Sequence, residues 1–144
     1  MAITQTMCTS FKLGLLNAEF DFGVGTTQTF KIALYTAAAS LGAFTTTYSA
    51  TNEVSGVGYY AGGNVLTISQ VPASSGTTAY LGFADVTWPD ATITARGALI
   101  YMDNGTTNPA VAVLDFGGDK TSNAQGFVVK FPLADASSAI LRIA

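Results

Sequence analysis

The spacing of apolar residues divides the chain near residue 25. Before that point apolar side chains recur every three or four residues, which is the period of a helix with one buried face. The positions concerned are Met7, Phe11, Leu15 and Leu16, with Cys8 beside them. This spacing predicts one helix from about residue 4 to residue 20, ended by Gly23-Val24-Gly25. Gly14 inside it is less favourable in a helix than alanine by about 1 kcal/mol.

From Thr27 onward the apolar positions alternate with polar ones, as expected for strands with one buried face. Phe30, Ile32 and Leu34 fall on one side of the first such segment. Turn-forming residues separate the later segments, among them the hairpin signal Asp103-Asn104-Gly105. The predicted strands cover residues 29–35, 64–71, 79–88, 91–102, 110–116, 126–132 and 139–144. The glycine-rich residues 51–63 predict a structured loop or a bent strand.

About seven short strands with regularly spaced turns are typical of all-β domains. We therefore expect a mainly β fold, namely a single-domain antiparallel β-sandwich or jelly roll with a short N-terminal helix. Residues 1–25 are expected to form an N-terminal helical docking segment, and residues 26–144 the β-sandwich domain. The 144 residues are enough for one hydrophobic core but not for two.

The composition changes this picture in one respect, because charged residues are scarce. Hydrophobic residues make up 49% of the chain, charged residues only 10%, and the mean hydropathy is +0.38. Soluble domains usually carry about 25% charged residues. The surface must therefore be covered by Thr, Ser, Gly and Asn, or by neighbouring subunits. We expect a homo-oligomer, most simply a trimer.

Binding to membranes or to nucleic acids is not expected. No segment approaches the roughly 20 unbroken apolar residues of a membrane-spanning helix, and the first residues lack the features of a secretion signal. The net charge is −3, and the six basic residues are scattered singly, so no basic stripe is available for phosphates. The single Cys8 cannot form an intrachain disulfide, which fits assembly in a cytosol.

Candidate chemistry is sparse, and we expect no enzymatic activity, no cofactor and no metal. The chain contains no His, so the commonest general base and metal ligand is missing. Cys8 lies in the predicted helix, where a buried thiol behaves as a small apolar residue. Four of the nine carboxylates stand beside Gly, Pro or Asn, where Asp commonly fixes turns. Residues 115–119 lack the ligand spacing of a calcium loop, and Gly56-Val57-Gly58 lacks the rest of a dinucleotide fingerprint.

Several segments, taken in order, resemble a family of small virion structural proteins of tailed bacteriophages. They are residues 11–12, 31–36, 51–59, 91–101, 110–117, 131–136 and 140–144. The resemblance spans nearly the whole chain, although no single motif is diagnostic. Members are described as tail-fibre-like or virion structural proteins, and some small β proteins of this size cement capsid shells. The resemblance implies a place in a phage particle, and it implies no catalytic residues.

These observations favour a capsid decoration, or cement, protein that binds and stabilises the shell of major capsid protein. The alternative is a tail-associated or tail-fibre protein involved in attachment to the host, and a carboxylate-dependent glycan hydrolase ranks last. The expected location is the virion, assembled in the host cytoplasm. Residues 1–25 could fold back on their own domain or reach onto a neighbour, and we favour the neighbour. The predicted interface residues are Phe11, Leu15, Leu16, Phe20 and Phe22.

Overall fold

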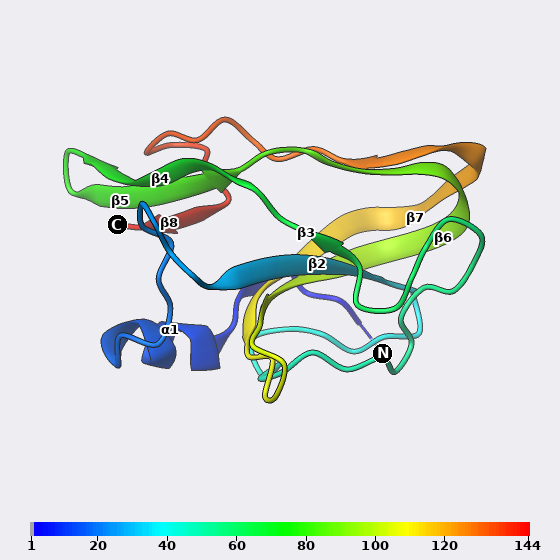
Figure 1. The fold of residues 1–144 in the computed structure, drawn as a ribbon, viewed down its shortest axis with the longest axis horizontal. Coiled ribbons are helices and arrows are strands. Elements are labelled where there is room, and N and C mark those ends of the chain that lie inside the picture. Colours follow the sequence, from blue (N-terminus) through cyan, green and yellow to red (C-terminus); the bar gives the residue numbers. More distant parts are fainter. Residues whose placement is uncertain (1) are drawn as a thin grey trace.

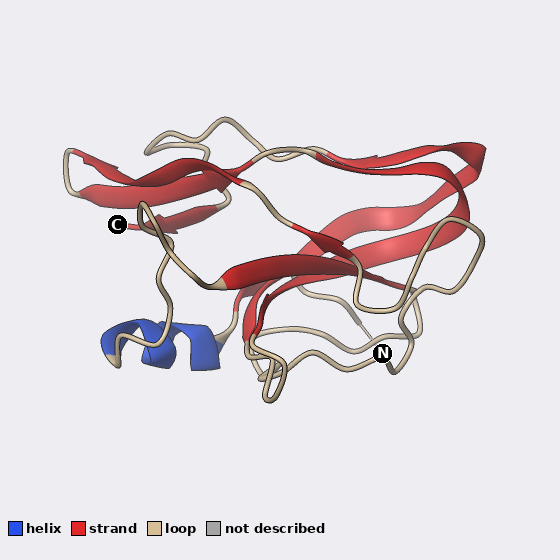
Figure 2. Cartoon of the chain, in the orientation of Figure 1, coloured by secondary structure: helices blue, strands red, loops and turns tan. Residues whose placement is uncertain are grey.

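The computed structural model describes residues 2–144 and is mainly β, with one short helix (Figures 1 and 2). In chain order the elements are β1 (Thr6–Met7), α1 (Thr9–Leu16), β2 (Thr29–Tyr35), β3 (Asn64–Val65), β4 (Ile68–Ser75), β5 (Thr78–Phe83), β6 (Val86–Asp103), β7 (Ala110–Val129) and β8 (Leu141–Ile143). All pairs of neighbouring strands are antiparallel. The prediction of a mainly β, antiparallel fold is therefore confirmed.

The strands form two sheets. A five-stranded sheet has the order β1-β7-β6-β2-β3, and a three-stranded sheet has the order β4-β5-β8. The long hairpin of β6 and β7 links them. The start of β6 and the end of β7 lie in the same layer as the smaller sheet. The hairpin then bends, and the rest of both strands lies in the other layer (Figure 1). Register shifts between Ala91 and Ile93 and between Ala95 and Gly97 lie along β6. Such bulges increase local twist and allow a strand to bend. The arrangement is consistent with a β-sandwich.

The core follows from the alternation of side chains along these strands. In β2 the side chains of Phe30, Ile32 and Leu34 are buried, as predicted. The first part of β6 alternates between buried and exposed positions, whereas residues 97–102 are buried on both faces. A strand covered on both faces reads as a continuous apolar run, as this segment does.

Several predicted boundaries were wrong. Pro89-Asp90 and Gly117-Gly118 were expected to end strands, but both lie inside longer ones. A register shift between Trp88 and Ala91 accommodates Pro89, which has no N–H to donate. Gly117 adopts φ 78°, the left-handed geometry of a bulge. The segment 64–71 is divided into β3 and β4.

The predicted helix over residues 4–20 is much shorter in the structure. Thr6 and Met7 pair instead with Val113 and Ala112 at the edge of the larger sheet, and α1 begins only at Thr9. Gly14 is required by packing, because a Cβ there would lie 2.5 Å from the ring of Phe20. The apolar spacing predicted that this segment packs through one face. It could not reveal that Thr6 and Met7, just before the helix, pair with β7.

The helix ends in a Schellman motif with alanine at its left-handed position. Glu19 N–H donates to the Gly14 carbonyl at 2.8 Å, and Ala18 N–H to the Leu15 carbonyl at 3.2 Å. Ala18 has φ 58°, where glycine is usually found. Ala18→Gly should therefore raise the free energy of unfolding by about 0.5–1 kcal/mol, since it removes the left-handed strain. Urea titration would check this, and an unchanged or lower midpoint would contradict it.

Candidate functional site

The carboxylate of Glu53 lies at the centre of a cluster of two tyrosine hydroxyls and a main-chain N–H group. It accepts hydrogen bonds from the hydroxyl of Tyr48 at 2.6 Å, the hydroxyl of Tyr59 at 2.5 Å and the N–H of Gly62 at 2.8 Å. Tyr59 in turn accepts a hydrogen bond from Leu34 N–H in β2 at 2.9 Å. The carboxylate thus fastens the glycine-rich segment, residues 51–63, to the larger sheet.

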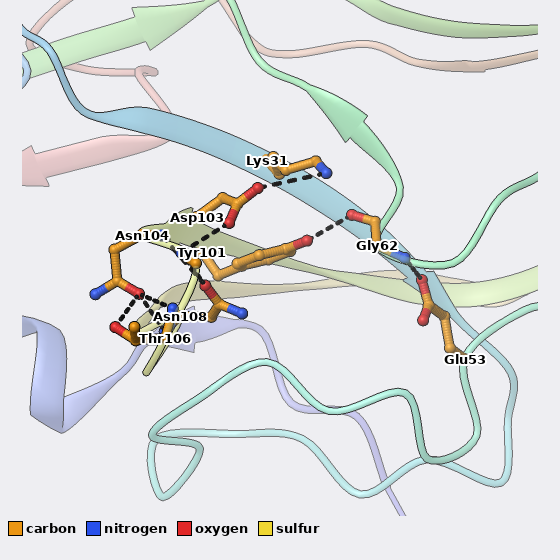
Figure 3. A network of polar contacts seen from close by, with 9 residues as sticks. Lys31, Glu53, Gly62, Tyr101, Asp103, Asn104, Thr106 and Asn108 are labelled. Atoms are coloured by element: carbon orange, nitrogen blue, oxygen red, sulfur yellow. Dashed lines mark hydrogen bonds and ion pairs between the residues drawn. The ribbon is translucent and has the colours of Figure 1, made fainter.

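A second branch joins this segment to the end of β6 (Figure 3). The hydroxyl of Tyr101 donates to the carbonyl of Gly62 at 2.7 Å. Beside it, the amino group of Lys31 in β2 lies 3.6 Å from a carboxylate oxygen of Asp103 in β6. The rings of Tyr48 and Tyr101 stack with centroids 4.7 Å apart. Tyr48, Tyr59 and Tyr101 therefore hold a loop to a sheet.

Burial changes the titration of these groups. It raises the pKa of Tyr101 to about 12, with smaller contributions from Asp103 and Glu53. Burial is also the largest cause that raises the pKa values of Tyr35, Tyr48 and Tyr59 well above their ordinary value. At neutral pH these hydroxyls remain protonated and act as hydrogen-bond donors.

These shifts predict a loss of stability at alkaline pH. Burial also raises the pKa of the Cys8 thiol, to about 11 from 9.0. Between these values the unfolded chain loses protons that the folded chain keeps, so unfolding is favoured as the pH rises. The thermal midpoint should fall steadily from pH 9 to pH 11, as measured by circular dichroism. A midpoint constant over this range would contradict the burial of these groups.

Some carboxylates outside this cluster accept hydrogen bonds from main-chain N–H groups close by in the sequence. Asp21 accepts from Gly23 N–H at 2.8 Å and Asp115 from Gly117 N–H at 2.9 Å. Asp135 accepts from the N–H groups of two serines, Ser137 and Ser138. Asp21 and Asp135 thus fix turns, whereas Asp115 supports the bulge at Gly117 inside β7, where a turn was expected. Within residues 2–144 no group of three or more His, Cys, Asp or Glu side chains is placed to hold a metal ion.

The predicted docking residues do not form one surface. Phe11, Phe20 and Phe22 are buried within the chain's own core, where Phe22 stacks on Phe30 of β2 at 4.2 Å between ring centroids. Residues 2–25 thus fold back on their own domain, in contrast to the favoured expectation. Of the five predicted residues, Leu15 is partly buried and Leu16 is 87% exposed. A role in docking stays a prediction, and it now rests on these two.

An apolar cleft of about 310 Å³ lies between α1 and the smaller sheet. Its lining includes Leu15, Phe22, Tyr80, Leu141 and Ile143. A second cleft of about 470 Å³ separates β1 and β7 from the C-terminal segment. We call the region that contains both clefts the open edge, and define it by β1, the end of α1 and β8. Because β1 and β8 are the outer strands of their sheets, sequence reasoning could not find it without the strand order.

The surface also carries large apolar side chains outside β1, α1 and β8. They include Val24, Phe44, Val57, Tyr60 and Leu133, each more than half exposed. No described helix is long and apolar enough to cross a membrane. Comparison with protein-family models, with curated proteins and with solved structures finds no match.

Proposed function

We propose that this chain is a non-enzymatic structural protein of a bacteriophage particle, and specifically a decoration protein that binds the shell of major capsid protein. The observation that carries the proposal is the open edge, where an apolar cleft is lined by Leu15 and Ile143 and followed by the exposed Leu16, in a chain with few charges. Apolar patches on such a surface are typical of contacts between proteins. The resemblance of the sequence to phage virion proteins supplies the kind of partner.

The fold offers a second line of support. Two layers of antiparallel sheet are the architecture of sandwich and jelly-roll domains, which recur in viral shells, and we propose the jelly-roll assignment on that basis. The open edge supplies outer strands and an apolar cleft. An extended segment of a neighbouring subunit can pair with such an outer strand through main-chain hydrogen bonds.

The proposal is tested first by quantitative mass spectrometry of purified virions, with the copy number compared with that of the major capsid protein. A ratio near one to one supports decoration of the shell. A small fraction favours the alternative, a tail-associated or tail-fibre protein, and complete absence from the particle contradicts both.

Point variants test the open edge. Leu16→Asp and Ile143→Asp should each weaken binding to purified shells at least tenfold, or about 1.4 kcal/mol, since the contact would bury a charge. Val57→Asp is the matched control, because Val57 is 73% exposed but pairs with Thr92, away from the open edge. Co-sedimentation with shells measures the binding. Equal binding by all three variants would contradict a role for the open edge.

A further inference from the structure

The turn between β6 and β7 contains the pair Asn104-Gly105, the only Asn-Gly sequence in the chain. Asparagine is among the thermally labile residues. Glycine after it has no Cβ to shield its main-chain nitrogen, and that nitrogen can attack the amide carbon of the preceding asparagine. The conformation of this turn therefore decides whether the pair is stable.

Both polar atoms of the Asn104 side chain, Oδ1 and Nδ2, form hydrogen bonds within the turn. Its Oδ1 accepts hydrogen bonds from the N–H groups of Thr106 at 3.0 Å and Asn108 at 2.9 Å, and from the Thr106 hydroxyl at 3.2 Å. Its Nδ2 donates to the Thr107 hydroxyl at 2.9 Å. Rotation of the amide carbon toward Gly105 would break these contacts (Figure 3).

The attacking nitrogen is occupied as well. Gly105 N–H donates to Asp103 Oδ1 and to Asn108 Oδ1, each at 3.2 Å. The nitrogen must lose this proton before it can attack, and a hydrogen bond to a carboxylate stabilises the protonated form. Asn108 contributes twice, because its Oδ1 also accepts from Asn104 N–H at 3.2 Å.

We propose that Asn104 is a latent site of self-modification, which the side chain of Asn108 keeps closed in the folded protein. In the reaction, Gly105 N loses its proton to a solvent base and forms a bond to Asn104 Cγ. The bond from Cγ to Nδ2 breaks, and ammonia leaves with a proton from solvent. Water then opens the cyclic imide to aspartate or to isoaspartate, with no change of oxidation state.

The product would alter the end of the hairpin. It places a second carboxylate beside Asp103, which is paired with Lys31, and isoaspartate adds one atom to the main chain. Both changes disturb a turn that holds Asn108, whose carbonyl accepts from Tyr48 N–H at 3.0 Å. The modification thus acts on Tyr48, whose hydroxyl is held by Glu53.

The test is peptide mapping by mass spectrometry after prolonged incubation at pH 8. Folded wild-type protein should convert Asn104 roughly ten- to a hundredfold more slowly than the same chain in urea, as expected when reacting atoms are held out of line. Asn108→Gly should convert faster than wild type while folded. Asn108→Asp, which keeps the acceptor, should stay slow. Residue 108 has φ 46°, which glycine and aspartate both tolerate.

Two results would overturn the proposal. One is conversion of folded wild type as fast as the chain in urea, a comparison that requires no variant. The other is an Asn108→Gly protein with an intact thermal transition that converts as slowly as wild type.

Discussion

Gly63→Ala should lower the free energy of unfolding by about 2–5 kcal/mol, because an added Cβ approaches its neighbours more closely here than at any other glycine. A Cβ at Gly63 would lie 1.8 Å from the carbonyl oxygen of Ile32, which is backbone and cannot rotate away. Overpacking of this kind costs about 1–3 kcal/mol. The left-handed φ of 75° adds about 1–2 kcal/mol for a residue with a side chain.

Gly25→Ala is the matched control for this substitution. Gly25 has nearly the same φ, 78°, but nothing lies within 4 Å of a Cβ built there. Only the conformational strain should remain, about 1–2 kcal/mol. Urea unfolding followed by Trp88 fluorescence measures both variants, and equal losses for the two would show that the contact with Ile32 is not tight.

Glu53→Ala should lower the free energy of unfolding by about 3 kcal/mol. It removes the acceptor of three hydrogen bonds and leaves the hydroxyl of Tyr59, a residue only 6% exposed, without an acceptor. Hydrogen bonds to charged groups contribute about 1.5–3 kcal/mol each, and their contributions are not additive. Glu53→Gln keeps one acceptor oxygen and should lose less.

Double-mutant cycles with Tyr48→Phe and Tyr59→Phe separate this network from general disruption. If the carboxylate acts through the two hydroxyls, the effects of Glu53→Ala and Tyr59→Phe should overlap by at least about 0.5 kcal/mol. Chemical denaturation supplies all the values. Fully additive losses would mean that the hydroxyl contacts contribute nothing to stability.

The parts of the fold that depend on local alternation were predictable. The bounds expected for the first strand, 29–35, agree with β2, because Phe30, Ile32 and Leu34 share one buried face. Alternation did not reveal that the opposite face is buried too, from Ala33 to Tyr35. The start of β7 at Ala110 was also predicted, but its continuation past Phe116 was not predictable from the same rule. A Gly-Gly pair has the same sequence signature in a loop and in a bulged strand, and only the pairing with β6 distinguishes them.

The candidate site was less predictable than the fold. The turn-closing aspartates stand next to the residues that they contact, so their role followed from sequence. The partners of Glu53 are five to nine residues away, and Tyr101 reaches Gly62 across 39 positions. Phe11, Phe20 and Phe22 show another limit. The spacing of apolar residues predicts that a ring will be buried, but it does not predict whether the ring packs against its own chain or against a neighbouring subunit.

The passage of β6 and β7 through both layers has a consequence for how the molecule bears load. A sandwich made of separate sheets is held together across its middle by side chains alone, and the layers can slide. Here the same two antiparallel strands run through the bend, with paired residues on either side of it, from Val86 with Val129 to Ala98 with Leu114. Force that separates the layers must therefore act against backbone pairing that extends through the bend, interrupted only by bulges, and the two layers should yield together in a single event.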